Sequence, residues 1–456
     1  MIRALYSAAM WLAQPALRRK LKRRGQAEPG YLHAIDERFG RYTQALPPHD
    51  GPTVWIHAVS LGETRAAAVL IAALRQRLPA MRLLLTHGTA TGQAEGAKLL
   101  QPGDLQAWQP WDTPGAVHRF LTHFQPALGV LMETELWPNL VHGARAQGVP
   151  LVLANARLSD QSLRQAQRLA WLARPAYAAL TAAWVQTPAD AQRLRSLGAP
   201  VCGVLGNLKF DAAPDAALLA RGHHWREHLA KPVVMFASSR EGEELALLQT
   251  LQAFSPAAQA NQAQAATESI VDKVQWLIVP RHPQRFDAVA QLIAAQGFSV
   301  QRRSTWSADG PPLASGDHPN VWLGDSLGEM ALYYGLADVA LLGGSFAPLG
   351  GQNLIEAAAC GAPVVMGAHT FNFADAAEQA IAAGAAWRVA DMAEAVATAA
   401  ALAQDASRLP PARRAALQFA LTHQGAAARL ADALVGLLNL DSSVDRLVSS
   451  PSPDQY

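Results

Sequence analysis

The feature that most constrains the fold is an alternation of two kinds of segment, which begins at about Thr53 and continues through most of the chain. Short runs rich in β-branched residues or leucine alternate with longer segments rich in alanine. This alternation is typical of parallel β-sheets whose strands are connected by helices. The sequence therefore predicts an α/β protein.

The strand-like runs fall into two series, which predict two doubly wound domains. The first series comprises residues 54–59, 82–86, 127–132, 151–154, 183–186 and 201–204. The second comprises residues 233–237, 276–279, 298–302, 321–323, 339–342 and 363–366. A chain of 456 residues, 50% of them hydrophobic, supplies enough apolar material for two cores.

The domain boundaries follow from these series. We predict a first Rossmann-like domain at 25–212, a second at 213–440 and a flexible tail at 441–456. Residues 413–438 have a helical pattern and could pack back across the first domain. Residues 255–267, rich in Ala and Gln, are interpreted as a surface insertion.

The first 24 residues combine an apolar run with a basic cluster. Residues 2–17 are mostly apolar, and six of the next seven residues are Arg or Lys. Arg3 and Pro15 leave a stretch shorter than the roughly 20 apolar residues that span a bilayer, so we favour a helix lying at the membrane interface. The basic residues would then meet anionic headgroups on the cytoplasmic side. The alternative is an ordinary amphipathic helix packed on the first domain.

A glycine-rich stretch at residues 343–365 follows one apolar run and leads into another. The order predicts a strand, a glycine loop, a helix that begins near Asn353 and a second strand. Glycines let a backbone approach a phosphate closely, and a helix N-terminus favours an anion. Glu356 could accept hydrogen bonds from ribose hydroxyls. Because two glycine pairs, an Asn and a Glu occur together, we favour a nucleotide-binding loop over a turn whose glycines only relieve crowding.

Glu63 ends the turn at residues 60–63, after the first predicted strand. It could face the cleft between the domains as a general base, and the positive end of the next helix should favour its ionised form. A glutamate that only complements the helix dipole is the alternative. This residue alone leaves the two interpretations open.

Two further carboxylates, Glu133 and Glu135, follow the predicted strand at 127–132. Two acids so close together need hydrogen-bond donors or a cation as partners. One of them could stabilise the reacting centre by bonding to an acceptor hydroxyl. The alternative is a capping arrangement for the next helix, in which Pro138 would be an early residue.

Basic side chains at other strand ends could offset the charge of a leaving phosphate. Lys209, at the end of the first domain, is one candidate, with a solvated lysine as the alternative. Arg281 follows a strand of the second domain and has the planar geometry for a bidentate phosphate or base contact. Residues 324–330 follow another strand and could contribute to a base pocket. Ligands of such sheets collect at the carboxyl ends of the strands.

Several classes of chemistry lack their sequence signatures. No Asp-X-Asp motif follows a strand and no His pair has metal-ligand spacing, so we expect no obligatory metal and no cofactor. No GxSxG elbow or Walker lysine loop supports a hydrolase or an ATPase. A net charge of +2 without an aromatic-interleaved basic patch argues against a nucleic-acid partner. The two cysteines, far apart, fit a reducing, cytoplasmic compartment.

Seven motifs carry a resemblance to a known family. They are VSLGET at 59–64, METELWPN at 132–139, ANARLS at 154–159, LKFD at 208–211, VPRHP at 279–283, GGQNLIE at 350–356 and MGAHTFNF at 366–373. On these motifs the chain resembles the 3-deoxy-D-manno-octulosonic acid (Kdo) transferases of lipopolysaccharide assembly, from its start to about residue 440. It departs from them in the insertion at 255–267 and in Gln352, where many members have His.

This resemblance implies an inverting glycosyltransferase of GT-B architecture, in which two Rossmann-like, doubly wound domains face a central cleft. The donor would be CMP-Kdo, with release of CMP. The acceptor would be the tetraacylated lipid A precursor, lipid IVA, or its Kdo-bearing product. The enzyme would work at the cytoplasmic face of the inner membrane.

The resemblance also implies roles for particular residues. Glu63 would be the base that deprotonates the acceptor hydroxyl, while Glu133 and Lys209 stabilise the transition state. The residues implied in CMP binding are Pro280, Arg281, Gly328, Glu329, Met330, Asn353, Leu354, Ile355 and Glu356. The rival interpretations are another GT-B transferase or an epimerase that uses a UDP-sugar, and a membrane-bound nucleotide sensor without activity.

Overall fold

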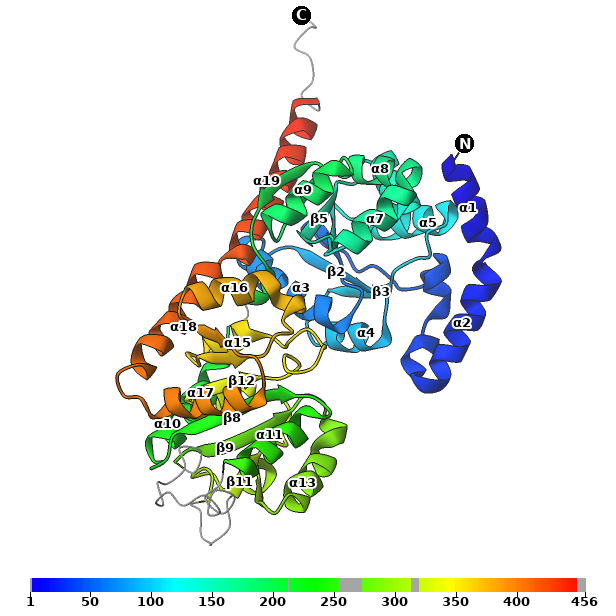
Figure 1. Cartoon of the computed structure of the whole chain (residues 1–456). Helices are drawn as coiled ribbons and strands as arrows, with labels where there is room; N and C mark the ends of the chain where they lie inside the picture. The colour runs from blue at the N-terminus through cyan, green and yellow to red at the C-terminus, as the bar shows by residue number, and fades with distance from the viewer. Residues whose placement is uncertain (1, 212, 255–272, 313–319, 449–456) are drawn as a thin grey trace, which may run out of the picture. The chain divides into compact units, whose positions relative to one another are not determined.

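The computed structural model describes residues 2–211, 213–254, 273–312 and 320–448 (Figure 1). These residues form two units. The first comprises Met1–Ala212 and Gln424–Tyr456, and the second comprises Ala213–His423. The insertion expected at 255–267 and the last residues of the expected tail, 449–456, lie outside the described residues.

The first unit contains a seven-stranded parallel sheet in the order β3-β2-β1-β4-β5-β6-β7. Its strands are β1 (Thr53–His57), β2 (Arg82–His87), β3 (Leu105–Trp108), β4 (Leu128–Met132), β5 (Leu151–Ala156), β6 (Ala182–Val185) and β7 (Val201–Val204). The helices between them are α3 (Leu61–Arg77), α4 (Ala90–Ala97), α5 (Pro114–Phe124), α6 (Pro138–Ala146), α7 (Asp160–Arg168), α8 (Ala170–Ala178) and α9 (Pro188–Ser196). The strand order reverses direction between β1 and β4.

The second unit also contains a seven-stranded parallel sheet, in the order β10-β11-β9-β8-β12-β13-β14, with β11 between β9 and β10. Its strands are β8 (Val233–Ser239), β9 (Gln275–Pro280), β10 (Ser299–Arg302), β11 (Asn320–Leu323), β12 (Val339–Leu342), β13 (Val364–Met366) and β14 (Ala386–Arg388). Its helices include α10 (Ala216–Glu227), α11 (Glu243–Ala253), α13 (Phe286–Ala295), α14 (Met330–Leu336), α15 (Leu354–Ala359), α16 (Ala374–Ala382), α17 (Met392–Gln404) and α18 (Leu409–His423). Here the order reverses between β8 and β12.

The strand prediction holds for the interior of both sheets and fails at one edge of each. Every predicted strand is present, with ends that differ by at most two residues. The sequence did not reveal β3 and β14, which are edge strands of four and three residues. Runs this short show no clear periodicity, and an edge strand pairs with a single neighbour.

The two faces of the first sheet enclose separate cores. Val54 and Ile56 of β1 belong to a core that includes α3, whereas Trp55 between them belongs to a core on the other face, with Phe120. Successive side chains of a strand point to opposite faces, so a strand covered by helices on both sides is apolar throughout. This explains why β1 appears in the sequence as a continuous hydrophobic run.

The final helix, α19 (Ala426–Val448), corrects the domain boundary that we placed at residue 440. Leu430 and Leu434 are buried in the first unit's core, where α19 contacts α3. Residues 424–440 therefore belong to the first unit, because the apolar face of α19 is buried there. The helix also continues through residues 441–448, where we expected a flexible tail.

Polar contacts also hold α19 to the first unit. The Asp211 carboxylate accepts the backbone N–H groups of Gly425 and Ala427, at the start of the helix. Further along, Arg77 of α3 forms an ion pair with Asp432. The expected return of the C-terminal helical segment to the first domain is thus confirmed for α19, whereas α18 stays in the second unit.

The N-terminal segment forms two helices, α1 (Ile2–Leu12) and α2 (Gln14–Ala27). We expected a single membrane-associating helix at residues 1–24. Pro15 lies in the first turn of α2, a position that proline tolerates. Helix α1 packs on the first unit, and the Ser7 hydroxyl donates to Asn139 Oδ1 at 3.0 Å. Among the described residues, no helix combines the length and apolarity needed to cross a membrane.

Candidate active site

Glu63 lies in the first turn of α3, directly after β1 and its turn. Its Oε2 accepts the backbone N–H of Val59 at 2.9 Å, and its Oε1 accepts the Ser60 hydroxyl at 3.1 Å. The Ser60 hydroxyl oxygen in turn accepts the Glu63 backbone N–H at 3.4 Å. This arrangement is close to a capping box, except that Glu63 accepts the N–H of Val59 rather than that of the N-cap Ser60, so Glu63 also stabilises the start of α3.

The acidity of Glu63 differs from our expectation. We expected the helix terminus to keep this carboxylate ionised, but burial raises the pKa of Glu63 to about 7, and the nearby charge of Glu133 adds to the effect. Desolvation outweighs the two hydrogen bonds that favour the charged form. A carboxylate with a pKa near 7 is a stronger base than an ordinary glutamate, which suits proton abstraction at neutral pH.

Glu133 follows β4, the neighbour of β1, and it has the partners that a buried carboxylate requires. Its side chain is 7% exposed. Oε2 lies 2.9 Å from Nε of Arg157, and Oε1 lies 3.7 Å from Nζ of Lys209. Arg157 belongs to one of the seven motifs, but we gave it no individual role. Lys209 is therefore paired and only partly exposed, which excludes the alternative of a purely solvated lysine.

Neither carboxylate of the Glu133 and Glu135 pair caps α6. That role belongs to Asp112, whose two oxygens accept the backbone N–H groups of Asn139 at 3.0 Å and Leu140 at 2.8 Å. The expectation that Pro138 would be an early helical residue is confirmed, since α6 begins there. Glu135 accepts the Trp137 indole N–H at 2.8 Å, and burial raises the pKa of its carboxyl group.

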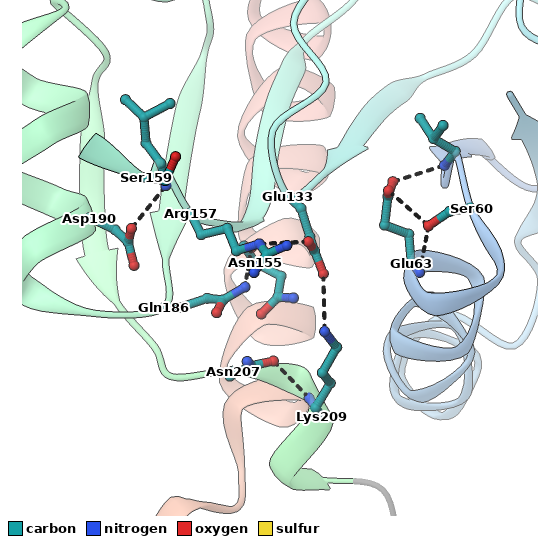
Figure 2. A network of polar contacts seen from close by, with 12 residues as sticks. Ser60, Glu63, Glu133, Asn155, Arg157, Ser159, Gln186, Asp190, Asn207 and Lys209 are labelled. Atoms are coloured by element: carbon teal, nitrogen blue, oxygen red, sulfur yellow. Dashed lines mark hydrogen bonds and ion pairs between the residues drawn. The ribbon is translucent and has the colours of Figure 1, made fainter. Parts of the chain in front are cut away.

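Asn155 connects the strand ends of this group. Its Oδ1 accepts the backbone N–H of Leu208 at 3.1 Å, next to Lys209, and its backbone carbonyl accepts Nε2 of Gln186 at 2.9 Å. Figure 2 shows Glu63 facing the group formed by Glu133, Arg157 and Lys209. The parallel topology explains the convergence, because these residues follow β1, β4, β5 and β7, whose carboxyl ends share one edge of the sheet.

In the second unit, the glycine stretch has the predicted order of β12, loop, α15 and β13. Asn353 is the N-cap of α15, and its Oδ1 accepts the backbone N–H of Ile355 at 3.2 Å. Gly343 is required by close packing, since a Cβ there would lie 2.2 Å from the Ser238 carbonyl oxygen. Gly350 has a φ of +86°, a conformation that favours glycine.

The backbone of this loop is held by a residue that the sequence did not single out. Glu243, a buried residue, accepts the N–H groups of Gly344 at 2.8 Å and Phe346 at 3.2 Å, and also that of Arg240 at 2.9 Å. Burial nevertheless raises the pKa of Glu243. Two amides of the glycine loop therefore bind an internal carboxylate, and an anionic ligand would need other donors. The position of Glu243 in the first turn of α11 was the available signal.

The predicted CMP-binding residues follow three strands of the second sheet, β9, β11 and β12, whose carboxyl ends lie along one edge. Pro280 ends β9, and Arg281 follows it with an exposed side chain. Nε of Arg281 donates to Oε1 of Gln352 at 3.2 Å, which joins the end of β9 to the glycine loop. The structure thus brings Arg281 and the loop together, as the prediction requires.

The group at residues 328–330 precedes and begins α14. The Glu329 carboxylate accepts hydrogen bonds from Arg221 at 2.7 Å, Arg303 at 2.9 Å and the Ser326 hydroxyl at 2.5 Å. Gly328 has a φ of +79°, and Met330 is the first residue of the helix. Glu329 is thus paired within the protein.

The residues at the start of α15 differ in what they can offer a ligand. The side chains of Leu354 and Ile355 are buried in the second unit, so contact with CMP would be made through their backbone. Asn353 and Glu356 are partly exposed. Among the described residues, no group of three or more His, Cys, Asp or Glu side chains is arranged to hold a metal ion.

The two units and their parallel sheets define the class of fold, a two-domain α/β protein of GT-B architecture. A glycosyltransferase structure from Rickettsia africae aligns with 88% of this chain and all of its own, with a TM-score of 0.52 and 11% identity. A putative UDP-N-acetylglucosamine 2-epimerase from Listeria monocytogenes aligns with a TM-score of 0.52 and 12% identity, over 89% of this chain and all of its own. At such low identity these similarities show the fold alone.

Sequence comparison decides the family. The family model for 3-deoxy-D-manno-octulosonic-acid transferase matches residues 33–212. The 3-deoxy-D-manno-octulosonic acid transferase of Bordetella pertussis is 46% identical over 95% of this chain and 98% of its own length. That of Haemophilus influenzae is 32% identical over 82% of this chain and 84% of its own. The chain belongs to the 3-deoxy-D-manno-octulosonic acid transferase family, and it is a glycosyltransferase.

Proposed function

We propose that this protein transfers Kdo from CMP-Kdo to a hydroxyl group of the lipid A precursor lipid IVA, or of its Kdo-bearing product, and releases CMP. The observation that carries this proposal is the 46% identity to the Bordetella pertussis transferase over nearly the whole chain. The carboxylates of the first unit and the basic and glycine-rich strand ends of the second supply the groups that such a reaction needs.

Glu63 is the proposed base. Its carboxylate accepts the proton of the acceptor hydroxyl, whose oxygen attacks the anomeric carbon of the donor while the bond from that carbon to the CMP phosphate oxygen breaks. Direct displacement of this kind inverts the configuration at the anomeric carbon. The raised pKa of Glu63, about 7, supports this role, and Glu133 with Lys209 is proposed to stabilise the transition state.

CMP is proposed to bind to the second unit. Arg281 has the geometry for a bidentate contact to the phosphate, and its bond to Gln352 orients the guanidinium. The residues proposed to complete the CMP site are Pro280, Gly328, Glu329, Met330, Asn353, Leu354, Ile355 and Glu356. CMP departs as a phosphate monoester whose charge the cationic side chains offset, so we propose that the reaction is independent of metal ions. Unchanged transfer in the presence of EDTA would support this.

The N-terminal helices are proposed to hold the enzyme at the cytoplasmic face of the inner membrane. Leu5, Trp11 and Leu12 of α1 are between 66% and 70% exposed, which is unusual for large apolar side chains. Trp171 at the start of α8, a helix that contacts α1, is 51% exposed. The exposed basic residues of α2 would lie at anionic headgroups.

Mass spectrometry of lipid IVA incubated with CMP-Kdo and the full chain tests the proposed reaction. We expect a product heavier than lipid IVA by one or two Kdo residues, together with CMP. Parallel incubations with UDP-sugars, and titration of the protein with CMP and UDP, test the rival donor class. Transfer or preferential binding with the uridine compounds would contradict the proposal.

A further inference from the structure

The guanidinium of Arg157 has hydrogen-bond donors beyond the Nε group that contacts Glu133. Nε lies 2.9 Å from Oε2 of Glu133, and the side chain is 53% exposed. An arginine offers donors along two edges, so an Nε contact leaves the Nη edge available to a second planar anion. Glu133 is also paired with Lys209, so two cationic side chains lie around this one carboxylate.

Asn155 provides an independent observation at the same place. The residue is 2% exposed, and among the described residues its Nδ2 has no hydrogen-bond partner. A buried amide without an acceptor costs free energy, so an unpaired donor of this kind needs an explanation. Figure 2 shows the Asn155 amide among Glu133, Arg157 and Lys209.

The backbone at this place is unusual as well. Asn155 has a φ of +51° and Glu133 a φ of +56°, at the ends of the adjacent strands β5 and β4. Non-glycine residues in the left-handed region are uncommon, and they concentrate at functional sites. Two such residues, a buried donor without a partner among the described residues, and two cationic side chains around one carboxylate all occur at this place.

The chemistry of the sugar donor indicates which anion could bind to the group formed by Asn155, Arg157 and Lys209. An ulosonic acid carries a carboxylate on its anomeric carbon, one bond from the carbon that the acceptor hydroxyl attacks. If Glu63 removes the proton from that hydroxyl, the carboxylate must lie close to Glu63. A planar carboxylate matches the Nη edge of an arginine in a bidentate contact.

We propose that Arg157 binds the carboxylate of the donor sugar, with Lys209 beside it, and that Asn155 is a positioning residue for both. This subsite rests on the proposed function, because it requires Kdo as the transferred group. When Arg157 and Lys209 turn toward the substrate, Nδ2 of Asn155 supplies Glu133 with a replacement donor. The subsite selects for an acidic sugar.

The test compares CMP-Kdo with its carboxamide analogue, in which the sugar carboxylate is replaced by a neutral amide. The full chain should use the acid about 100-fold more efficiently than the amide, and Arg157→Ala should lose this preference by slowing only the reaction of the acid. Arg157→Lys should restore part of it. A structural defect would instead slow both donors equally and leave the preference intact, an outcome that overturns the proposal.

Further measurements show whether a lost preference in Arg157→Ala comes from the sugar carboxylate, from the CMP moiety or from the acceptor. CMP lacks the sugar carboxylate, so its affinity should be unchanged in Arg157→Ala, as in the control Arg145→Ala on the exposed surface of α6. If Arg157→Ala instead abolishes discrimination between phosphorylated and dephosphorylated lipid acceptors, the bound anion is an acceptor phosphate and the proposal is wrong. If the unaltered chain does not turn over CMP-Kdo at all, the proposed function fails rather than the subsite.

Asn155→Gly tests the positioning role, because glycine accepts the φ of +51° while the amide is lost. We expect a roughly tenfold fall in kcat for CMP-Kdo with little change in CMP affinity. The pH profile should also change, since Glu133 would lose its replacement donor near Glu63. Activity and pH profile matching those of the unaltered chain would remove Asn155 from the subsite.

Discussion

Each unit has a seven-stranded parallel sheet whose strand order reverses once, but the two units place different chemistry at the point of reversal. In the first unit, β1 and β4 are followed by the carboxylates Glu63 and Glu133, with cationic partners around the second. In the second unit, β8 and β12 are followed by Glu243 and the glycine loop, and Glu243 binds loop amides. A carboxylate thus serves as a candidate base in one unit and as a structural anchor in the other. The difference lies in what surrounds each carboxylate, because Glu63 and Glu243 both follow the first strand of their sheet.

The sharpest way to break this comparison is to remove the proposed base. Glu63→Gln retains the size of the side chain but cannot accept a proton, so transfer should fall by about 10²–10⁴-fold while CMP affinity stays within twofold. Rate measurements with CMP-Kdo and lipid IVA, alongside titration with CMP, test this. Glu95→Gln, at an exposed ion pair of α4, is the matched control. Retained transfer in Glu63→Gln would refute the base assignment.

The next largest predicted effect is a loss of stability, and it follows from the packing of α19 in the core of the first unit. Leu434 is fully buried in the first unit's core, so Leu434→Ala should lower the free energy of unfolding by about 2–5 kcal/mol. Leu421→Ala removes a side chain that is 59% exposed on α18 and should change stability by less than about 0.5 kcal/mol. Denaturant unfolding of both variants provides the measurement. Equal effects would contradict the observed packing of α19.

A substitution in the second unit should affect binding of the nucleotide rather than proton transfer. Arg281→Ala removes the proposed phosphate contact, so CMP affinity should fall by about 10- to 100-fold. Calorimetric titration with CMP would measure this, and Arg408→Ala at an exposed site of the same unit should bind normally. An unchanged CMP affinity in Arg281→Ala would exclude that residue from the nucleotide site.

The smallest predicted effect is the dependence of the transfer rate on pH, which tests the environment of the Glu63 carboxylate in the first unit. Because burial raises the pKa of Glu63 to about 7, its carboxyl group is protonated, and inactive as a base, below that pH. We expect kcat/KM to fall about tenfold for each pH unit below 7 and to level off above it. Rates measured between about pH 3.5 and 9 would reveal this limb. A limb near the ordinary pKa of glutamate, about 4.3, would show that Glu63 is not buried in the working enzyme.

Sequence patterns predicted those features that depend on neighbouring residues in the chain. The interior strands of the first sheet are mostly apolar because buried cores lie on both of its faces, so they were evident as short hydrophobic runs. The glycine loop was equally evident, since its order of strand, loop, helix and strand is a local pattern. The short edge strands β3 and β14 have too few residues to show such a pattern.

The candidate site was predicted only in part. Glu63, Glu133 and Lys209 were named from the sequence, and the structure places Glu133 beside Lys209. The pairing of Glu133 with Arg157 was not foreseen, because strands β4 and β5 bring together side chains that are far apart in the chain. The role of Glu243 in the glycine loop was missed for the same reason, since its amide partners lie about a hundred residues away.

The sequence by itself determined the α/β class, the two series of strands and the family to which the chain belongs, because each is written in residue types and their local spacing. Only the tertiary structure decided that α19 completes the first unit, that Glu63 has a raised pKa and that Nδ2 of the buried Asn155 has no hydrogen-bond partner among the described residues. Burial and charge proximity depend on distances between residues remote in sequence. Desolvation acts on a group only after the rest of the chain has folded around it.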